Sequence, residues 1–554
     1  MAFFDKLSKT VTEVSQKTIA KAKELADTSR LAALLCLSLT GCAGKNVSED
    51  SSSAGDNTIE ESADSGKNDV WVALSMNVDT LDLVMTTSVG GRQVALGTVW
   101  ERLLTLNSQG EPVPELCESY EMSEDVTTFT FHLRQGVLFH DGSEMTADDV
   151  VASMNRWIET YSNVQELVGS GRFEKVDNYT VKITTDTPAL TLPDMIAGAT
   201  VTALITTADA CADLTETGYL KNYVGTGPYK FTEFVQDQYI RLDRFDDYVP
   251  YGEDGYVDGM AGHKDAAAQT LYYSYVQEAA TRIAGLQTGQ YDLIYGLTSD
   301  NYDIIANTPG VETQTQEAGT LILVMNKKEG LCTDVNFRQA VNAALSMDDI
   351  MTVGYGSFYS LGSCYMDECN GFWLTDAGSE NYNRSDLELA KKYLAQSSYQ
   401  EGDVFTIMTT NENNRDKLAL VIASQLEAIG ITCDVQPYDY PTMNAYQSDP
   451  SLYDMFVISY SSVPLPTLKF YLGSGAGFWT TDETFQNYIS CFNQATTKDE
   501  AYQIWEELQA YCWNDYLPVI NCGHYQECYA WNADTLSNVN IYNNIAHMWS
   551  VSVN

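Results

Sequence analysis

Two short runs of the chain contain residue types that bind metals or activate water. His140-Asp141-Gly142 places an imidazole beside a carboxylate, and Asn521-Cys522-Gly523-His524 places a thiol two residues from an imidazole. A protein metal site needs three or four such ligands, and no Cys-x-x-Cys or His-x-x-x-His pair accompanies either run. A tight turn closed by Asp141 explains the first run, and a structural cysteine beside a surface histidine explains the second. We therefore predict no metal and no cofactor.

The signatures of several enzyme classes are also missing. The chain has no G-x-S-x-G, no H-E-x-x-H and no P-loop, and its five histidines leave few candidate general bases. A net charge of −45 over 554 residues, with no basic stripe, repels nucleic acid. We predict a protein that is not an enzyme and binds no nucleic acid. Its 44% hydrophobic content is ordinary for a globular protein.

A short apolar segment near the N-terminus ends at Cys42. The run from Leu31 to Leu39 is too short for a membrane span, which needs about 20 residues, but it fits the apolar core of a signal peptide. Leu39-Thr40-Gly41-Cys42 resembles the lipobox of bacterial lipoproteins, in which the cysteine is acylated. The resemblance implies that residues 1–41 are a signal peptide with an extended N-terminal segment. An extended signal and a fused start both remain open for residues 1–30.

The residues after Cys42 are suited to a tether. Residues 48–67 are rich in Ser, Asp, Glu, Gly and Asn and have little apolar surface to bury. We predict that residues 42–68 form a lipidated cysteine with a flexible tether, which anchors an extracytoplasmic protein to the outer face of the cell membrane. Of the twelve cysteines, ten then remain in a compartment that permits disulfides. Pairing between Cys364 and Cys369, or among Cys512, Cys522 and Cys528, stays open.

Apolar periodicity predicts strands and helices that do not alternate strictly, which indicates an α/β fold with mixed sheets. The predicted strands are residues 70–74, 128–133, two within 173–185, 229–234, 239–244, 271–276, 321–325 and 453–460. The predicted helices are residues 92–104, 146–157, 278–288, 336–344, 385–396, 415–429 and 499–512. Thr146 and Asp149 match a capping box at the second of these helices.

Seven runs, in this order along the chain, match the motifs of one family. They are Val99-Trp100-Glu101-Arg102-Leu103-Leu104, residues 129–137, 139–143, 145–150 and 224–231, Asp334-Val335-Asn336-Phe337-Arg338-Gln339-Ala340, and Ala428-Ile429-Gly430-Ile431. Together they resemble the extracytoplasmic solute-binding lipoproteins of ABC importers, family 5, which take oligopeptides, dipeptides or nickel complexes. The resemblance covers the chain from about Asp69 to its C-terminus.

The resemblance implies a monomeric clam-shell receptor with the type II periplasmic-binding-protein fold, two lobes and an inserted extra domain. By the family's pattern, lobe I comprises residues 69–110, 223–316 and 529–554. The inserted domain comprises residues 111–222, and lobe II comprises residues 317–528. In the family the lobes close on a ligand, and the closed form docks on the permease subunits of an ABC importer.

The family's peptide ligands lie extended between the lobes and pair with receptor backbone as an added strand. Carried over by position, the binding strands are Ser88, Val89 and Gly90 in lobe I and Ser459, Tyr460 and Ser461 in lobe II. Gly225, Gly227 and Pro228 match the crossing motif between domains. Their residue types suit it, because glycine adopts backbone angles that other residues avoid and proline fixes a turn.

One departure concerns the ligand's amine. The family's peptide receptors carry an Asp after the second strand, and Val463 stands at that place here. A buried ammonium group without a counter-charge is costly, so either Asp439 or Asp454 meets it or the ligand has no free amine. We treat Val463 as a side-chain contact to the ligand, and Trp479, which follows the glycine-rich run 473–477, as a second.

The resulting hypothesis is a lipid-anchored receptor that captures peptides and delivers them to an ABC transporter. Two alternatives stay open. The same fold could bind a non-peptide ligand, such as an oligosaccharide or a metal chelate, or it could serve as a sensor lipoprotein without transport.

Overall fold

A mixed sheet of eleven strands runs through the described part of the chain, which in this computed structural model is residues 68–554 without 237 and 413. Cys42, the predicted signal peptide and the tether up to residue 67 lie outside the described residues. Ten strands follow the order β17 (Thr432–Tyr438), β16 (Val404–Thr410), β18 (Met455–Ser461), β14 (Val311–Met325), β19 (Val519–Asn532), β13 (Leu293–Leu297), β1 (Asp69–Leu74), β12 (Thr270–Tyr275), β9 (Tyr239–Arg244) and β8 (Tyr229–Val235). The remaining strand, β15 (Tyr359–Ser360), pairs with β19.

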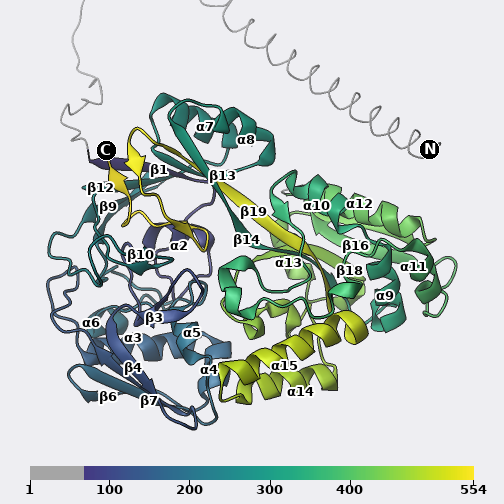
Figure 1. Cartoon of the computed structure of the whole chain (residues 1–554), viewed down its shortest axis with the longest axis horizontal. Coiled ribbons are helices and arrows are strands. Elements are labelled where there is room, and N and C mark those ends of the chain that lie inside the picture. The colour runs from purple at the N-terminus through teal and green to yellow at the C-terminus, as the bar shows by residue number, and fades with distance from the viewer. Residues whose placement is uncertain (1–67, 237, 413) are drawn as a thin grey trace, which may run out of the picture. The chain divides into compact units, whose positions relative to one another are not determined.

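The two longest strands, β14 and β19, join the two ends of this sheet. They pair with each other antiparallel from Val311↔Asn532 to Val324↔Val519. At one end β13 pairs with β19, and at the other β18 pairs with β14. Figure 1 shows β14 and β19 passing from the strands around β1 and β12 to those around β16 and β18. A bulge between Glu317 and Gly319 lies where their neighbours change.

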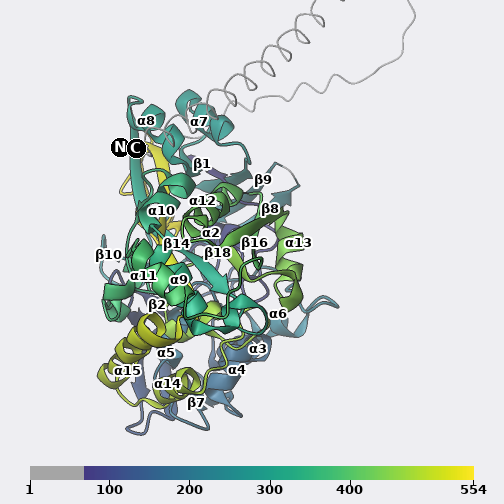
Figure 2. The same ribbon diagram turned by 90° about the vertical axis from the view of Figure 1, so that its right-hand side faces the viewer.

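Helices cover both groups of strands. At one end α7 packs on β13 and α8 on β14, and at the other α12 packs on β16, β17 and β18. Figure 2 shows α9 to α12 gathered over the group of strands that contains β16 and β18. The α-helices are α2 (Val89–Ala95), α3 (Ala147–Thr160), α4 (Ser162–Val168), α5 (Leu192–Ala197), α6 (Ala208–Ala212), α7 (Ala279–Thr288), α8 (Ser299–Ala306), α9 (Val335–Ala344), α10 (Met347–Tyr355), α11 (Leu387–Leu394), α12 (Arg415–Glu427), α13 (Tyr440–Tyr446), α14 (Glu483–Gln494) and α15 (Lys498–Tyr511).

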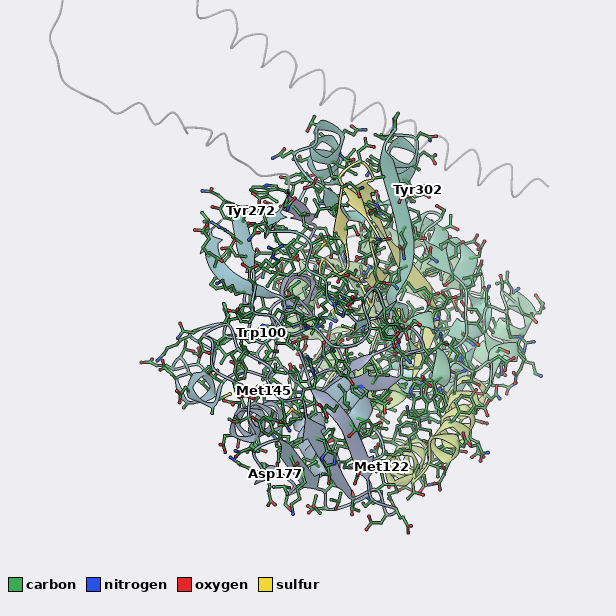
Figure 3. The ribbon with its side chains drawn as sticks, turned by 60° about the vertical axis from the view of Figure 1, so that its left-hand side comes forward. Trp100, Met122, Met145, Asp177, Tyr272 and Tyr302 are labelled. Atoms are coloured by element: carbon green, nitrogen blue, oxygen red, sulfur yellow. The ribbon has the colours of Figure 1, made fainter. Side chains whose placement is uncertain are left out.

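A separate four-stranded antiparallel sheet has the order β4 (Cys117–Met122), β5 (Thr128–Leu133), β7 (Thr180–Thr184) and β6 (Phe173–Asp177). Helix α3 packs on β6 and β7 and begins with the predicted capping box of Thr146 and Asp149. Its core includes Met145, which is fully buried and labelled with Trp100 in Figure 3. The predicted pair of strands joined by Asp177 and Asn178 is confirmed.

Shorter elements complete the described residues. The paired short strands are β2 (Leu104–Leu106) with β3 (Pro112–Pro114), β10 (Val257–Asp258) with β11 (Ala261–Gly262), β20 (Leu536–Ser537) with β23 (Ser552–Val553) and β21 (Ile541–Tyr542) with β22 (Ile545–Ala546). The 3₁₀ turns are η1 (Leu331–Thr333), η2 (Glu368–Trp373), η3 (Ser379–Asn381), η4 (Pro450–Leu452), η5 (Pro466–Leu468) and η6 (Phe470–Leu472), and η7 (Cys512–Tyr516) is a π-helix. Among the described helices, none has the length and apolar character needed to cross a membrane.

The predicted helix over residues 92–104 is wrong. Helix α2 begins at Val89 and ends at Ala95, because Leu96 is extended and Gly97 turns the chain with a φ of +80°. Val99 and Trp100, which suggested a helical stripe, are fully buried in the loop that follows. These residues are apolar because the loop is buried on all sides, and not because they form the apolar face of a helix.

All ten cysteines of the described residues carry free thiols. Cys364 and Cys369 are both buried, and burial raises the pKa of each thiol. Cys512, Cys522 and Cys528 are also fully buried. The disulfides that the sequence left open are thus absent from this part of the chain. Cys491 on α14 is exposed.

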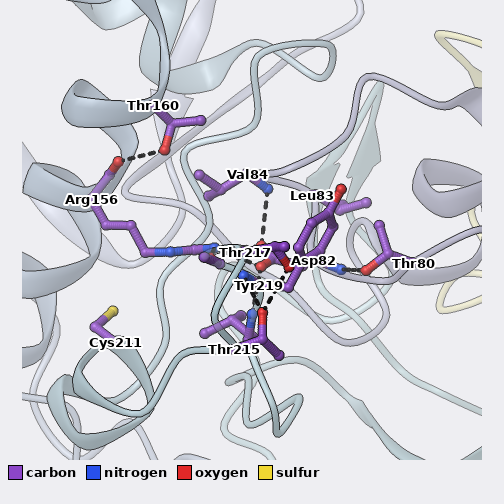
Figure 4. Close-up of polar contacts among 12 residues, drawn as sticks. Thr80, Asp82, Leu83, Val84, Arg156, Thr160, Cys211, Thr215, Thr217 and Tyr219 are labelled. Carbon is purple, nitrogen blue, oxygen red and sulfur yellow. Dashed lines mark hydrogen bonds and ion pairs between the residues drawn. The ribbon is translucent and has the colours of Figure 1, made fainter.

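A buried ion pair joins the loop after β1 to helix α3. Arg156 on α3 holds Asp82 with two bonds, Nη1 to Oδ1 at 3.1 Å and Nη2 to Oδ2 at 2.5 Å. The same carboxylate accepts the backbone N–H groups of Val84 and Leu220. Figure 4 shows this carboxylate at the centre of its contacts. Since Asp82 is fully buried, its charge is compensated inside the protein.

A second buried charge cluster explains the Val99–Leu104 motif. Lys264 Nζ lies 2.8 Å from Glu101 Oε1 and 2.8 Å from Glu115 Oε1. Thr226, from the crossing motif, donates its hydroxyl to Glu101 Oε2 at 2.9 Å. Burial alone would raise the pKa of Glu101, but the positive charges of Lys264 and Arg134 outweigh it and hold the pKa below its ordinary value. The motif residues therefore bind segments of the scaffold to one another.

We expect Lys264→Met to destabilise the protein by about 3–5 kcal/mol, because the change leaves two buried carboxylates without their shared cation. The melting temperature and the denaturant midpoint of the variant check this. Lys392→Met, which removes an exposed lysine from α11, is the matched control. Equal stability of the two variants would contradict a role for this cluster in holding the scaffold together.

Candidate functional site

The two histidine-containing runs have structural contacts. Gly225 N–H donates to His140 Nδ1 at 3.2 Å, and His140 Nε2 lies 2.9 Å from the carbonyl of Gly227. Desolvation lowers the pKa of His140 to about 4, which keeps the ring neutral at pH 7. Asp141 accepts the N–H of Ser143 at 2.9 Å, which confirms the predicted turn.

His524 and Cys522 are also buried, so the predicted surface position of this histidine is wrong. His524 Nδ1 lies 3.3 Å from the hydroxyl of Thr320, and the carbonyl of Cys522 accepts the hydroxyl of Tyr382. Within residues 68–554, as far as they are described, no group of three or more His, Cys, Asp or Glu side chains is placed to hold a metal ion.

The crossing residues Gly225, Gly227 and Pro228 lie against the loop after α2. A Cβ at Gly225 would stand 1.9 Å from the carbonyl oxygen of Val99, and one at Gly227 would stand 2.1 Å from that of Thr98. Neither glycine has a positive φ, so the predicted reason for them, unusual backbone angles, is wrong. They are required because two backbones approach closely here.

Ser459, Tyr460 and Ser461 form the last residues of β18. On one edge of this strand they pair with Leu321, Thr320 and Gly319 of β14. On the other edge β16 pairs only with Met455 and Phe456. Beyond Phe456, that edge has no paired strand among the described residues. An added strand could bind there through backbone hydrogen bonds.

Ser88, Val89 and Gly90 do not form the predicted strand. Ser88 is the N-cap residue of α2, and Val89 and Gly90 begin its first turn. Gly90 packs against the chain before the helix, where a Cβ would stand 2.5 Å from the carbonyl oxygen of Asn77. The seven residues of α2 are apolar or small apart from Arg92 and Gln93, and all of them except Val89 are buried.

Thr200 connects the two predicted segments. Arg92 of α2 donates from Nη1 to Thr200 Oγ1 at 3.2 Å, and Thr200 donates to the carbonyl of Ser462 at 3.3 Å. Residues 88–92 and 459–462, which are far apart in the sequence, are thus brought to one place.

Sequence reasoning missed four side chains at this place. Arg415, at the start of α12, donates from Nη2 to the Ser459 hydroxyl at 2.6 Å. Tyr355 and Tyr525 stack with ring centroids 5.3 Å apart and planes 12° from parallel. Glu527 lies two residues after Tyr525 on β19. Arg415 could have been found from the sequence, because it follows the carboxyl end of β16. Proteins with α/β folds bind ligands at that end of their strands.

The predicted side-chain contacts, Val463 and Trp479, are both largely buried. Trp479 stacks on Tyr453 with centroids 6.2 Å apart, and Lys328 Nζ lies 5.5 Å from its ring. Trp479 therefore belongs to the hydrophobic core. Val463 lies next to Ser462 in the segment that Thr200 contacts.

The two carboxylates considered for a ligand amine bind the backbone. Asp439 caps α13 by accepting the N–H of Thr442. Asp454 accepts the N–H groups of Leu331 and Thr406 at 3.1 and 2.9 Å. Glu527 is half-buried, and burial raises the pKa of its carboxyl while the charge of Arg282 opposes that change. It is the carboxylate that shares the face of β19 with Tyr525.

A cavity of about 360 Å³ lies elsewhere, between β4, α5 and the start of α15. Its lining includes Tyr120, Met122 and Asp194 on one side and Thr496 and Lys498 on the other. Lys498 Nζ approaches Asp194 Oδ1 at 3.2 Å across it. This cavity does not include residues 459–461, so it is distinct from the free edge of β18.

Comparison with known proteins identifies the family. The profile of bacterial extracellular solute-binding proteins, family 5 Middle, matches residues 111–481. A probable peptide ABC transporter periplasmic-binding protein of Sinorhizobium fredii, y4tO, is 25% identical over 475 residues, which are 81% of this chain and 87% of that protein.

Two solved structures show the same fold. One is a dipeptide binding protein from Pseudoalteromonas sp. SM9913 in complex with Met-Leu, with a TM-score of 0.70, 19% identity and coverage of 88% of this chain and 100% of that one. The other is AgaA from A. tumefaciens R10 in complex with agropinic acid, with a TM-score of 0.71, 23% identity and coverage of 88% and 99%. The predicted family and the predicted α/β fold of type II periplasmic binding proteins are confirmed.

We expect Gly227→Ala to lower stability by about 1–3 kcal/mol, because the added methyl group meets the carbonyl oxygen of Thr98. Thermal and denaturant unfolding measure the change. Gly475→Ala is the control, since a Cβ at Gly475 meets nothing within 4 Å and its φ is not positive. If both variants unfold alike, close backbone approach is not the reason for the glycine at position 227.

Proposed function

This chain belongs to the bacterial extracellular solute-binding proteins of family 5, and from that premise we propose that it captures peptides between two lobes and delivers them to the permease of an ABC importer. The observation that carries the proposal is that β16 pairs with β18 only at Met455 and Phe456. The last residues of β18 lie beyond that ladder, near the start of α2 through Thr200. An extended peptide gains affinity from backbone bonds at such an edge without being selected by sequence.

The proposed domains follow the strand pairing. Lobe I is residues 69–110, 223–316 and 529–554, the inserted domain is residues 111–222, and lobe II is residues 317–528. Strands β14 and β19 pass between the lobes, and the bulge between Glu317 and Gly319 is their proposed hinge. Bulges interrupt the ladder and allow a strand to bend.

Contacts between these domains support a closed arrangement. Thr200 of the inserted domain bonds Ser462 of lobe II, and Asp194 of the inserted domain pairs with Lys498 of lobe II. Tyr542 of lobe I donates its hydroxyl to the carbonyl of Cys369 in lobe II at 2.9 Å. Closure removes water from the ligand and strengthens its polar contacts.

Relatives support a peptide as the ligand. The Sinorhizobium fredii relative is named as a probable peptide ABC transporter periplasmic-binding protein. The structure of the Pseudoalteromonas protein contains the dipeptide Met-Leu. The AgaA complex with agropinic acid supports the alternative, a non-peptide ligand on the same fold. A transport receptor and a sensor without transport would have the same ligand site. They would differ in the membrane protein that they bind.

The cellular setting is part of the proposal. We place the monomeric protein outside the cytoplasm, held to the membrane by acylated Cys42. A Cys42→Ala variant that stays in the membrane fraction after alkaline washing would contradict the anchor. Co-purification of permease subunits with the closed, ligand-bound protein supports transport, and their absence in a strain that carries the transporter supports the sensor alternative.

Native mass spectrometry of the full-length protein, released from detergent, tests the ligand. We expect adducts with a ladder of peptide masses, because main-chain recognition accepts many sequences. A single non-peptide mass would overturn the peptide assignment and keep the receptor role. Peptide fragments produced during incubation would instead show hydrolysis and contradict a binding function.

We expect Lys498→Met to weaken peptide binding about two- to fivefold, because it removes the ion pair between a partly exposed lysine and the buried Asp194 that bridges the inserted domain and lobe II. Small-angle scattering should show a larger radius of gyration for the ligand-free variant. Lys175→Met removes an ion pair inside the inserted domain and serves as the control. If peptide affinity and radius of gyration change in Lys175→Met but not in Lys498→Met, the lobes do not close across this contact.

A further inference from the structure

The cavity between β4, α5 and the start of α15 contains a carboxylate that its neighbours satisfy only in part. Asp194 on α5 lines this cavity of about 360 Å³ and is 2% exposed. Its Oδ1 lies 3.2 Å from Lys498 Nζ. Its Oδ2 is buried and has no hydrogen-bond partner within the described residues. A buried carboxylate oxygen without a donor costs free energy, which a bound donor would recover.

Asp82 shows how this protein satisfies a buried carboxylate elsewhere. Each of its two oxygens accepts a bond from Arg156, and the backbone N–H groups of Val84 and Leu220 add two more. Asp194 has one basic partner, the partly exposed Lys498. The two acids therefore differ in the number of donors that the protein supplies, and Asp194 has room for another.

The charges around Asp194 also leave a negative surplus. Burial raises the pKa of Asp194, the positive charge of Lys498 opposes that rise, and the carboxylate of Glu111 adds to it. Because the effect of burial exceeds the effect of Lys498, a second cation at this place would stabilise the ionised form of Asp194. Among the described residues, Lys498 is the one basic side chain within ion-pair distance of this carboxylate.

Much of the remaining cavity wall is apolar. It includes Pro112, Tyr120, Met122 and Leu190. The ring of Tyr120 stacks on Phe131 with centroids 5.8 Å apart, which holds it in place. The volume falls within the roughly 300–1,000 Å³ of small-molecule sites, in which apolar walls surround a few polar groups. An aromatic face also attracts cations.

We propose that this cavity binds a small primary ammonium compound with a short apolar chain. The ammonium group donates to Asp194, and the chain lies against Met122 and Leu190. An ammonium group has three N–H donors and forms strong, charge-assisted bonds with a carboxylate. The carboxyl group of Asp194 turns about its terminal bond at low cost, so one oxygen can meet the ligand while the other keeps Lys498.

This site is separate from residues 459–461, which do not line the cavity. The proposal therefore does not depend on peptide capture at the end of β18. Free amines and free amino acids both carry a primary ammonium group, and the experiment distinguishes these two sources.

The test is calorimetric titration of the full-length protein with three compounds that share one carbon chain. They are 3-methylbutylamine, leucine, which adds a carboxylate to that amine, and 3-methyl-1-butanol, which replaces the ammonium group with a hydroxyl. We expect the amine to bind about tenfold more tightly than the alcohol, because a hydrogen bond to a charged group is stronger than one to a neutral group. Leucine binding as tightly as the amine would assign the site to amino acids, and weaker binding of leucine would assign it to free amines.

Two variants locate the binding. Asp194→Asn keeps the shape of the side chain without its charge and should weaken amine binding about tenfold. Met122→Trp, at a 43% exposed position labelled in Figure 3, should fill the cavity and abolish binding. The matched controls should bind as the unmodified protein does. They are Asp148→Asn, an exposed carboxylate paired with Lys175, and Val176→Trp, 54% exposed on β6 at the other edge of the same sheet.

Melting temperatures complete the test. The amine should raise the melting temperature of the unmodified protein and of both controls, and it should leave that of Met122→Trp unchanged, because only a bound ligand stabilises the folded state. Equal affinity for the amine and the alcohol would overturn the proposal, since the charge is then not recognised. Full binding in both Asp194→Asn and Met122→Trp would place the amine elsewhere and overturn it too, as would no binding of amine or leucine at millimolar concentration.

Discussion

The pairing of β14 with β19 is the constraint on which the rest of the structure depends. These two strands contribute to both groups of strands in the main sheet, so each group is completed by segments that continue into the other. A ladder of backbone bonds resists stretching but bends at an irregularity, and the bulge at Glu317 lies where the neighbours change. In the proposed receptor, each lobe therefore keeps its internal packing when the angle between the lobes changes.

The sequence predicts most of the scaffold, because its elements have local signals. Helix α7 ends at Thr288, because the next residue, Gly289, has a left-handed conformation, and the capping box fixes the start of α3. The predicted helix over residues 92–104 was wrong because Val99 and Trp100 are buried in a loop. Their apolar side chains have the same spacing as the apolar face of a helix. The glycines at 225 and 227 were recognised, but their reason, close approach to Thr98 and Val99, depends on a contact that no local pattern reveals.

The site was less predictable, for a related reason. Residues 459–461 could be assigned to a strand from a family pattern, but only the structure shows that β16 ends its pairing with β18 at Phe456, before these residues. Arg92 and Arg415 belong to helices on separate parts of the chain, and each alone resembles an ordinary helix residue. Their contacts with residues 459–462, one through Thr200 and the other directly to Ser459, emerge only in three dimensions.

The free thiols have a practical consequence for watching this protein move. Burial raises the pKa of Cys117 and Cys433 to about 12, and it also raises the pKa of Cys332, Cys512 and Cys522, so at neutral pH these groups are almost entirely protonated and react slowly. Cys491 on α14 faces solvent. A maleimide dye added to the folded protein should attach there before the other described cysteines react, which provides an optical reporter on α14 without engineering.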